Sequence, residues 1–171
     1  RWMYEESFRM PFLIKCPGKI KPGTVSNDLI MNIDFAPTLL DFAQLKSPEE
    51  MQGKSFKSSF SDASGTFRES VYYHYYEYPI WHKVQPHYGI RTERYKLIHF
   101  YYSMDEWELY DLENDPQEMN NIYKTAPDSL VEFLKTKLSE SQKNYMDNGS
   151  LEEMKLMTDT IITRIYNEPK K

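Results

Sequence analysis

Histidine is the side chain best suited to acid–base chemistry near neutral pH, and the chain contains four histidines. His82 and His87 lie in one aromatic segment, Tyr78–His87, which also contains a tryptophan and two prolines. Because loops on a rigid scaffold often carry binding groups, we expect these two histidines to contact a ligand. The alternative is a packed loop in which each histidine ring bonds its own backbone. His74 and His99 lie within expected strands, and we interpret them as residues of the sheet.

The other reactive side chains do not form a catalytic set. Cys16 is the single cysteine, so the chain has neither an internal disulfide nor a thiolate zinc site. It ends an apolar run, where we expect a buried and unreactive thiol. Glu5–Glu6 and Glu49–Glu50 are sequence neighbours whose carboxylates point to different sides, so neither pair predicts a shared proton. With no zinc motif, phosphate loop or calcium loop in the sequence, we predict no catalytic residue and no metal in this chain.

The first part of the chain is expected to mix strand and helix. Residues 10–16 form a short apolar run that stops at a Pro-Gly turn, which is typical of a strand buried in a parallel sheet. Residues 29–33 are expected to be extended. A helix is predicted over about 35–44, with the Asp34 carboxylate as its N-cap and Pro37 in its first turn.

A polar, Ser-rich stretch at 46–69 is the best candidate for a boundary, because it separates two differently patterned parts of the chain. Aromatic and branched residues that alternate in polarity then predict three or four antiparallel strands over 70–112, with a tight hairpin at Glu93-Arg94. A helix is expected to begin near Thr125, with Thr125 and Asp128 as a capping pair, and to end at 148–149. It would cover one face of the sheet. A second amphipathic stretch follows at 151–165. These patterns predict an α+β protein.

Length and charge limit the class of protein. The 171 residues suffice for one domain of ordinary size, and the net charge of −5 argues against a nucleic-acid partner. No apolar run is long enough for a transmembrane helix, so we expect no membrane partner. The first residues lack both a signal-peptide layout and an initiating methionine, so we expect a piece of a longer chain.

Five segments, in order along the chain, resemble motifs of type I sulfatases, the formylglycine-dependent members of the alkaline-phosphatase-like superfamily. Glu108–Asn121 resembles their E-L-Y-D-L-x-x-D-P-x-E-x-x-N stretch, and Gly89–Ile98 resembles their G-V-R-T-x-x-Y-K-L-I hairpin. The other three segments are Tyr4–Phe12, Pro17–Gly23 and Asp34–Asp41. The residues after about Ser150 lie outside the resemblance.

The resemblance implies a division into three parts. Residues 1–60 would end the large α/β sulfatase domain, and 66–148 would form a C-terminal subdomain with a four-stranded antiparallel sheet packed by a helix. Residues 149–171 would be an amphipathic extension. The family's calcium ligands and its formylglycine motif, C/S-x-P-x-R, would precede Arg1. Because Cys16 is followed by Pro-Gly-Lys, it does not match that motif, and we expect this chain alone to be inactive.

The resemblance also implies a role at the mouth of the substrate pocket. Trp81, His82 and His87 are then candidates for contacts with hydroxyl groups of a sulfated sugar, and Arg91 is a further candidate. The expected partner is the remainder of the catalytic domain, in a periplasmic, extracellular or lysosomal protein. If the chain exists alone, its apolar strand predicts self-association. Two other functions stay open: a stand-alone module that binds a glycan or a partner, and part of a related phosphonate or phosphodiester hydrolase.

Overall fold

A computed structural model describes residues 1–60, 66–79 and 82–167. The chain forms two compact units. One unit combines Arg1–Met10 with Tyr72–Lys171, and the other consists of Pro11–Val71. The second boundary therefore follows the Ser-rich stretch directly, and the first ten residues belong to the same unit as the sheet. No helix in the described ranges is both long and apolar enough to cross a membrane.

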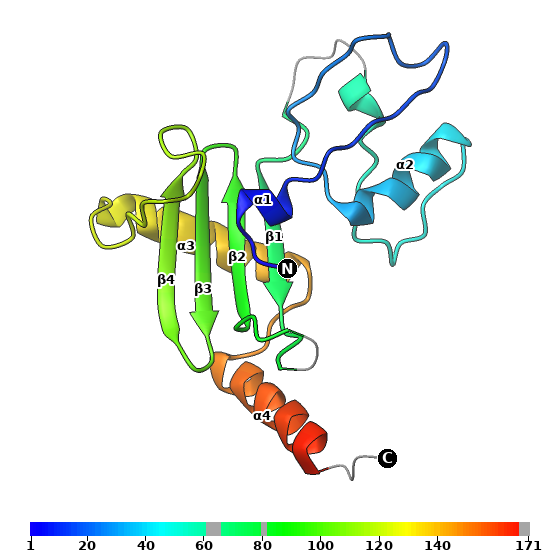
Figure 1. The fold of residues 1–171 in the computed structure, drawn as a ribbon. Coiled ribbons are helices and arrows are strands. Elements are labelled where there is room, and N and C mark those ends of the chain that lie inside the picture. The colour runs from blue at the N-terminus through cyan, green and yellow to red at the C-terminus, as the bar shows by residue number, and fades with distance from the viewer. Residues whose placement is uncertain (61–65, 80–81, 168–171) are drawn as a thin grey trace. The chain divides into compact units, whose positions relative to one another are not determined.

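The larger unit is built on a four-stranded sheet in the order β1-β2-β3-β4 (Figure 1). The strands are β1 (Ser70–Tyr75), β2 (His87–Thr92), β3 (Tyr95–Tyr101) and β4 (Asp105–Asp111). β2 and β3 pair antiparallel around the Glu93-Arg94 turn, with Ile90 opposite Leu97, so the predicted hairpin is confirmed. β3 and β4 also pair antiparallel. The predicted α+β class and the antiparallel sheet are confirmed.

Each face of this sheet is covered by a different part of the chain. Helix α3 (Asp128–Asn144) crosses one face, where Leu134 and Leu138 pack against Ile90, Leu97 and Leu109 (Figure 1). The segment Arg1–Met10, with the short helix α1 (Glu5–Phe8), covers the other face. There Met3 packs with three strand residues, Ile98, Phe100 and Tyr110. Helix α4 (Leu151–Asn167) follows α3.

The smaller unit contains helix α2 (Phe35–Phe42) between two 3₁₀ turns, η1 (Asn32–Asp34) and η2 (Lys57–Phe60). Phe56 is its buried centre and is 1% exposed. Its ring lies 5.7 Å from the ring of Phe12, 5.9 Å from that of Phe35, 5.5 Å from that of Phe60 and 6.4 Å from that of Phe67, measured between ring centroids. Because Phe56 lies inside the polar stretch 46–69, that stretch is packed structure as well as a connection.

Several predicted local features are wrong. Residues 10–16 form no strand in the structure, because a strand needs hydrogen-bonding neighbours that the described residues do not supply. Consequently Cys16 is partly exposed and not buried, although it is a free cysteine as expected. Of the residues 29–33, which we expect to be extended, Met31 is extended, whereas Asn32 and Ile33 belong to the turn η1. Asp34 does stand at the N-cap of α2, but its carboxylate makes no cap hydrogen bond.

The Asp34 carboxylate binds Arg68 in a bidentate ion pair instead, with Nη2 2.8 Å from Oδ1. It also accepts the backbone N–H of Lys54 and of Met31. These partners outcompete the helix N-terminus because a charged fork satisfies both carboxylate oxygens at once. The predicted capping pair at α3 is absent as well: its N-cap is Pro127, and Thr125 bonds the Ile122 carbonyl.

Candidate functional site

The connection between β1 and β2 carries the aromatic segment that the sequence singles out. His82 is exposed in this connection, and Val84 and Pro86 are buried beneath it. Trp81, the predicted sugar-contacting tryptophan, lies outside the described residues. The second arm of the connection is fixed to the β3–β4 turn, because the Ser103 hydroxyl donates to Gln85 Oε1 at 2.6 Å. His82 is therefore exposed to solvent in a connection whose second arm is held by a hydrogen bond.

His87 begins β2 and is completely buried. Its ring lies against the rings of Trp2, Tyr75 and Phe100, at centroid distances of 5.9, 5.5 and 5.0 Å. Nδ1–H donates to the Gln85 carbonyl at 2.8 Å, so Nε2 is the unprotonated nitrogen, and it has no hydrogen-bond partner in the described part of the chain. Burial lowers the pKa of His87 to about 4, so the ring is neutral at physiological pH.

Arg91 lies on the same face of β2 as His87, because side chains four residues apart in a strand share a face. It pairs with Glu5 of α1, with Nη2 3.2 Å from Oε2. The same carboxylate lies 2.8 Å from the Nζ of Lys96, a lysine with no exposed surface. Lys96 also contacts Glu118 at 2.6 Å, and Glu118 accepts the backbone N–H of Glu5. Two cations and two carboxylates thus fasten α1 to the sheet.

The electrostatics of this cluster favour its charged state. Burial alone would raise the pKa of Glu5, but the hydrogen bonds and charges of Lys96 and Arg91 outweigh that effect and lower it. Buried charges cost free energy unless they are paired in this way. His87 and Arg91 are therefore brought to one sheet face under Arg1–Met10, whereas His82 lies in the loop. The role of all three in substrate binding stays a prediction.

His74 and His99 are sheet residues, in β1 and β3, as predicted. Each makes a carboxylate–histidine–tyrosine chain. His74 Nδ1 donates to Asp147 at 2.6 Å and Nε2 accepts from the Tyr101 hydroxyl at 2.9 Å. His99 Nε2 donates to Asp105 and Nδ1 accepts from Tyr88, both at 2.8 Å.

Each of these hydrogen-bonded rows contains the aspartate and the histidine of a nucleophilic triad, but a tyrosine stands in the place of the nucleophile. Burial raises the pKa of Tyr101 far above neutrality, and it raises the pKa of Tyr88 to about 12, so neither hydroxyl ionises to a nucleophile. Burial also lowers the pKa of both histidines, although their aspartate partners oppose the shift. The chains stabilise the sheet and its connections. Sequence reasoning missed Asp147, which no local pattern links to His74.

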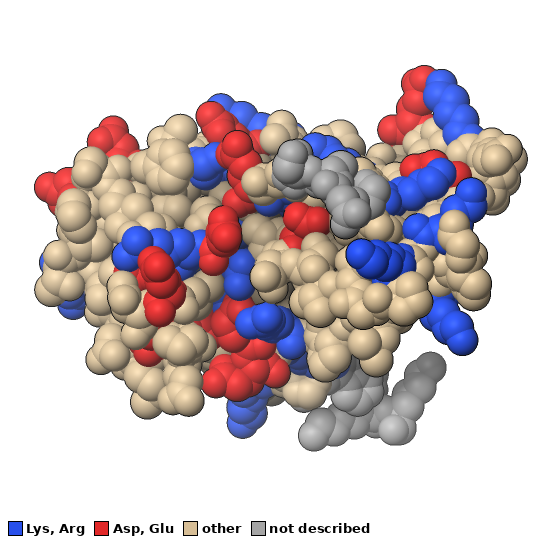
Figure 2. Space-filling view, turned by 90° about the horizontal axis from the view of Figure 1, so that it is seen from above, with Lys and Arg blue, Asp and Glu red and all other residues tan. Residues whose placement is uncertain are grey.

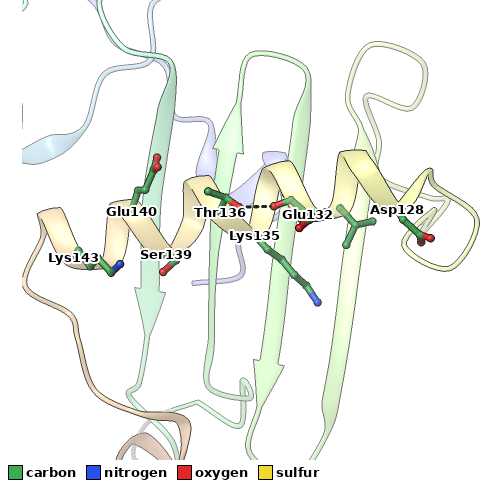
Figure 3. A pocket seen from close by; sticks show the side chains of 8 residues that line it. Asp128, Glu132, Lys135, Thr136, Ser139, Glu140 and Lys143 are labelled. Carbon is green, nitrogen blue, oxygen red and sulfur yellow. Dashed lines mark hydrogen bonds between the residues drawn. The ribbon is translucent and has the colours of Figure 1, made fainter.

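A metal site and a ligand pocket are the remaining candidates in the described part of the chain. Within residues 1–60, 66–79 and 82–167, no three His, Cys, Asp or Glu side chains are grouped so as to hold a metal ion. A shallow, open pocket lies along the outer side of α3 (Figure 3). Acidic and basic side chains are mixed along it, including Glu132, Lys135 and Lys143. Seven of its eight lining residues are polar or charged and Val131 is the eighth, so its surface is that of an ordinary solvated helix.

Comparisons with known proteins agree with this architecture. A family model described as N-sulphoglucosamine sulphohydrolase, C-terminal, matches residues 1–144. An N-acetylglucosamine-6-O-sulfatase of Bacteroides thetaiotaomicron is 50% identical over 152 residues, which cover 86% of this chain and 27% of that protein. An arylsulfatase of Clostridium perfringens is 31% identical over 156 residues, covering 86% of this chain and 31% of that protein.

A solved structure gives the same result in three dimensions. It shows a protein in complex with its substrate D-glucosamine-2-N,6-O-disulfate, and it is 49% identical with a TM-score of 0.85. The match covers 90% of this chain and 32% of that one. The chain therefore spans about a third or less of the length of the relatives it matches.

Proposed function

The chain belongs to the family of N-sulphoglucosamine sulphohydrolase C-terminal domains, and on that premise we propose that it is the C-terminal part of a sulfatase that removes sulfate from sulfated glycans. The proposed substrates carry a 6-O-sulfated glucosamine unit. The observation that supports this choice is the 50% identity, over 152 residues, to an N-acetylglucosamine-6-O-sulfatase. The expected location is periplasmic, extracellular or lysosomal.

The catalytic groups belong to the rest of the protein under this proposal. Sulfatases generally use a formylglycine and a metal ion, which supply a nucleophile and a positive charge for the sulfate oxygens. The residues described here do not fit either group: they offer no metal cluster, and Cys16 is followed by Pro-Gly-Lys, so it does not begin the C/S-x-P-x-R motif from which a formylglycine is made. We propose that calcium and formylglycine lie in the part of the protein outside this chain, and this chain alone is inactive.

The contribution of this chain is to shape the substrate pocket. We assign direct contact with the sugar to His82 and Trp81, because His82 is exposed on a tethered loop. His87 and Arg91 lie on the sheet face that Arg1–Met10 covers. We propose that both residues hold that segment against the sheet, and that their contribution to sugar binding acts through it. The division into 1–60, 66–148 and 149–171 also stays a proposal.

The test is sulfate release by the full-length protein. We expect hydrolysis of N-acetylglucosamine-6-O-sulfate, and we expect His82→Ala to raise KM about tenfold with a smaller effect on kcat, because a ground-state sugar contact is lost. Glu93→Ala is the control, since it lies in the turn at the opposite end of β2. Glycan binding without hydrolysis would favour the stand-alone binding module, and hydrolysis of phosphonate esters in place of sulfate esters would favour the related hydrolase.

A further inference from the structure

Helix α4 is the element that the proposed function leaves unexplained. It lies outside residues 1–144, which the family model matches. Its surface is still partly covered, because Met154 is 5% and Thr158 is 1% exposed. Figure 1 shows α4 at the end of the sheet where the β3–β4 turn and the β1–β2 connection lie. One face of α4 is therefore packed against its own unit.

The contacts of α4 are concentrated on the β3–β4 turn. The Tyr102 hydroxyl donates to Asp159 Oδ1 at 2.5 Å. One helical turn earlier, Lys155 Nζ lies 3.9 Å from Asp105 Oδ2. Lys155 and Asp159 are four residues apart, so they share a helix face. The two contacts bind both ends of the turn to that face.

The same turn contacts both arms of the β1–β2 connection. The Tyr102 ring lies 5.6 Å from the ring of Tyr78, centroid to centroid, on the first arm. On the second arm Ser103 bonds Gln85, and the Tyr101 N–H donates to the Pro86 carbonyl at 3.3 Å. The turn therefore lies between α4 and the loop that carries His82.

We propose that α4 is a positioning element for the β1–β2 loop, and that it acts through the Asp159–Tyr102–Tyr78 contacts. Tyr102 is the central residue because its hydroxyl contacts the helix and its ring contacts the loop. Without the Asp159 contact the Tyr102 ring would lose its preferred orientation, and Tyr78 would lose its support. The consequence for substrate binding rests on the proposed function, but the positioning of the loop does not.

Three variants of the full-length protein test the Tyr102 hydroxyl and the Asp159 carboxylate separately. Tyr102→Phe keeps the ring on Tyr78 and removes the hydroxyl. Asp159→Ala removes the acceptor, whereas Asp159→Asn keeps a carbonyl oxygen that accepts the same hydrogen bond. Thr160→Ala is the matched control, because Thr160 is an exposed neighbour on α4 whose hydroxyl donates within the helix, to the Leu156 carbonyl.

The first measurement is hydrogen–deuterium exchange of the loop without substrate. We expect Tyr102→Phe and Asp159→Ala to speed exchange of the Tyr78 amide, which donates to the Tyr76 carbonyl in this loop, about tenfold, with Asp159→Asn and Thr160→Ala near wild type. Amides in the centre of β3 should be unchanged, which excludes general unfolding. Unchanged exchange in the loop with Asp159→Ala would overturn the proposal.

The second measurement is the split between KM and kcat for N-acetylglucosamine-6-O-sulfate. We expect the same two variants to raise KM about threefold to tenfold with kcat preserved, because the loop is displaced and the chemical groups are not. Faster loop exchange with an unchanged KM would uphold the positioning role of α4 and would contradict the assignment of His82 and Trp81 to the substrate.

Discussion

At the residue scale, one face of β2 carries two basic side chains that differ in their charge state. His87 and Arg91 share a face of β2, and the first ten residues cover both. Arg91 keeps its charge because Glu5 lies beside it. The His87 ring packs against aromatic rings and donates one hydrogen bond to a carbonyl, and its burial keeps it neutral. The neutral ring packs where an imidazolium would be an unpaired buried charge.

His87 makes stability depend on pH in a definite direction. Its pKa falls from 6.5 to about 4 on folding, so between these values the unfolded chain binds a proton that the folded chain does not. Stability therefore rises with pH across this window and is lost as pH falls from 6.5 towards 4. The loss attributable to His87 is about 3 kcal/mol. Urea unfolding of the 171-residue chain at pH 4 to 7 measures it.

His87→Phe provides the comparison, because a neutral ring at this position cannot titrate. His74 and His99 also have lowered pKa values, so the wild-type curve contains their contributions too. The difference between the wild-type and His87→Phe curves isolates the one residue. A difference that does not change with pH would contradict the buried, neutral histidine.

At the element scale, the β2–β3 pair and the segment Arg1–Met10 meet at a position that only glycine fits. Gly89 lies opposite Ile98 in the ladder. A Cβ atom on Gly89 would lie 2.3 Å from the Leu97 carbonyl oxygen and 2.7 Å from Met3 Sδ. Met3 is 1% exposed, so it has little room to move away. The close packing of both layers depends on the missing side chain.

Gly89→Ala should therefore destabilise the sheet unit by about 1–3 kcal/mol, the usual cost of forcing atoms into a filled core. Gly149→Ala is the matched control, because its added carbon would come no closer than 3.7 Å to Met154. Urea unfolding followed by tyrosine and tryptophan fluorescence compares the two. Equal stability of the two variants would show that the strands separate to accommodate the methyl group.

At the scale of the whole molecule, the two units differ in how well their apolar residues are covered. The sheet unit has buried clusters on both faces. In the smaller unit Leu13 is 95%, Val25 86% and Leu39 65% exposed. Charged residues are interspersed with uncharged ones over the face that Figure 2 displays. We infer that the exposed apolar side chains of the smaller unit are covered by the remainder of the protein.

This inference predicts unequal protection in the isolated 171-residue chain. Amides of residues 12–31 should exchange within seconds, because they make few backbone hydrogen bonds, whereas amides of β2 and β3 should be protected for hours. Hydrogen–deuterium exchange of a dilute monomer measures both. In the full-length protein, residues 12–31 should become protected. Equally slow exchange of both regions in the isolated chain would contradict the inference.

The sequence alone determined the elements whose signals are local. Alternating aromatic and branched residues predicted three or four strands, of which the structure has four; the Glu93-Arg94 turn predicted the hairpin, and helical spacing predicted α2 and α3. The resemblance of five segments to sulfatases predicted the family that the comparisons show. The expected strand at 10–16 was wrong, because a strand depends on hydrogen-bonding neighbours and not on its own apolar residues.

Only the tertiary structure decided what the polar side chains do. Lys96 and Glu118 have no sequence signal that pairs them with Glu5, and His74 has none that pairs it with Asp147. The sequence predicted Asp34 as the helix cap, whereas in the structure its carboxylate pairs with Arg68. Charge pairing and burial depend on which distant residues come within about 4 Å, so they follow from the folded chain and not from spacing along it.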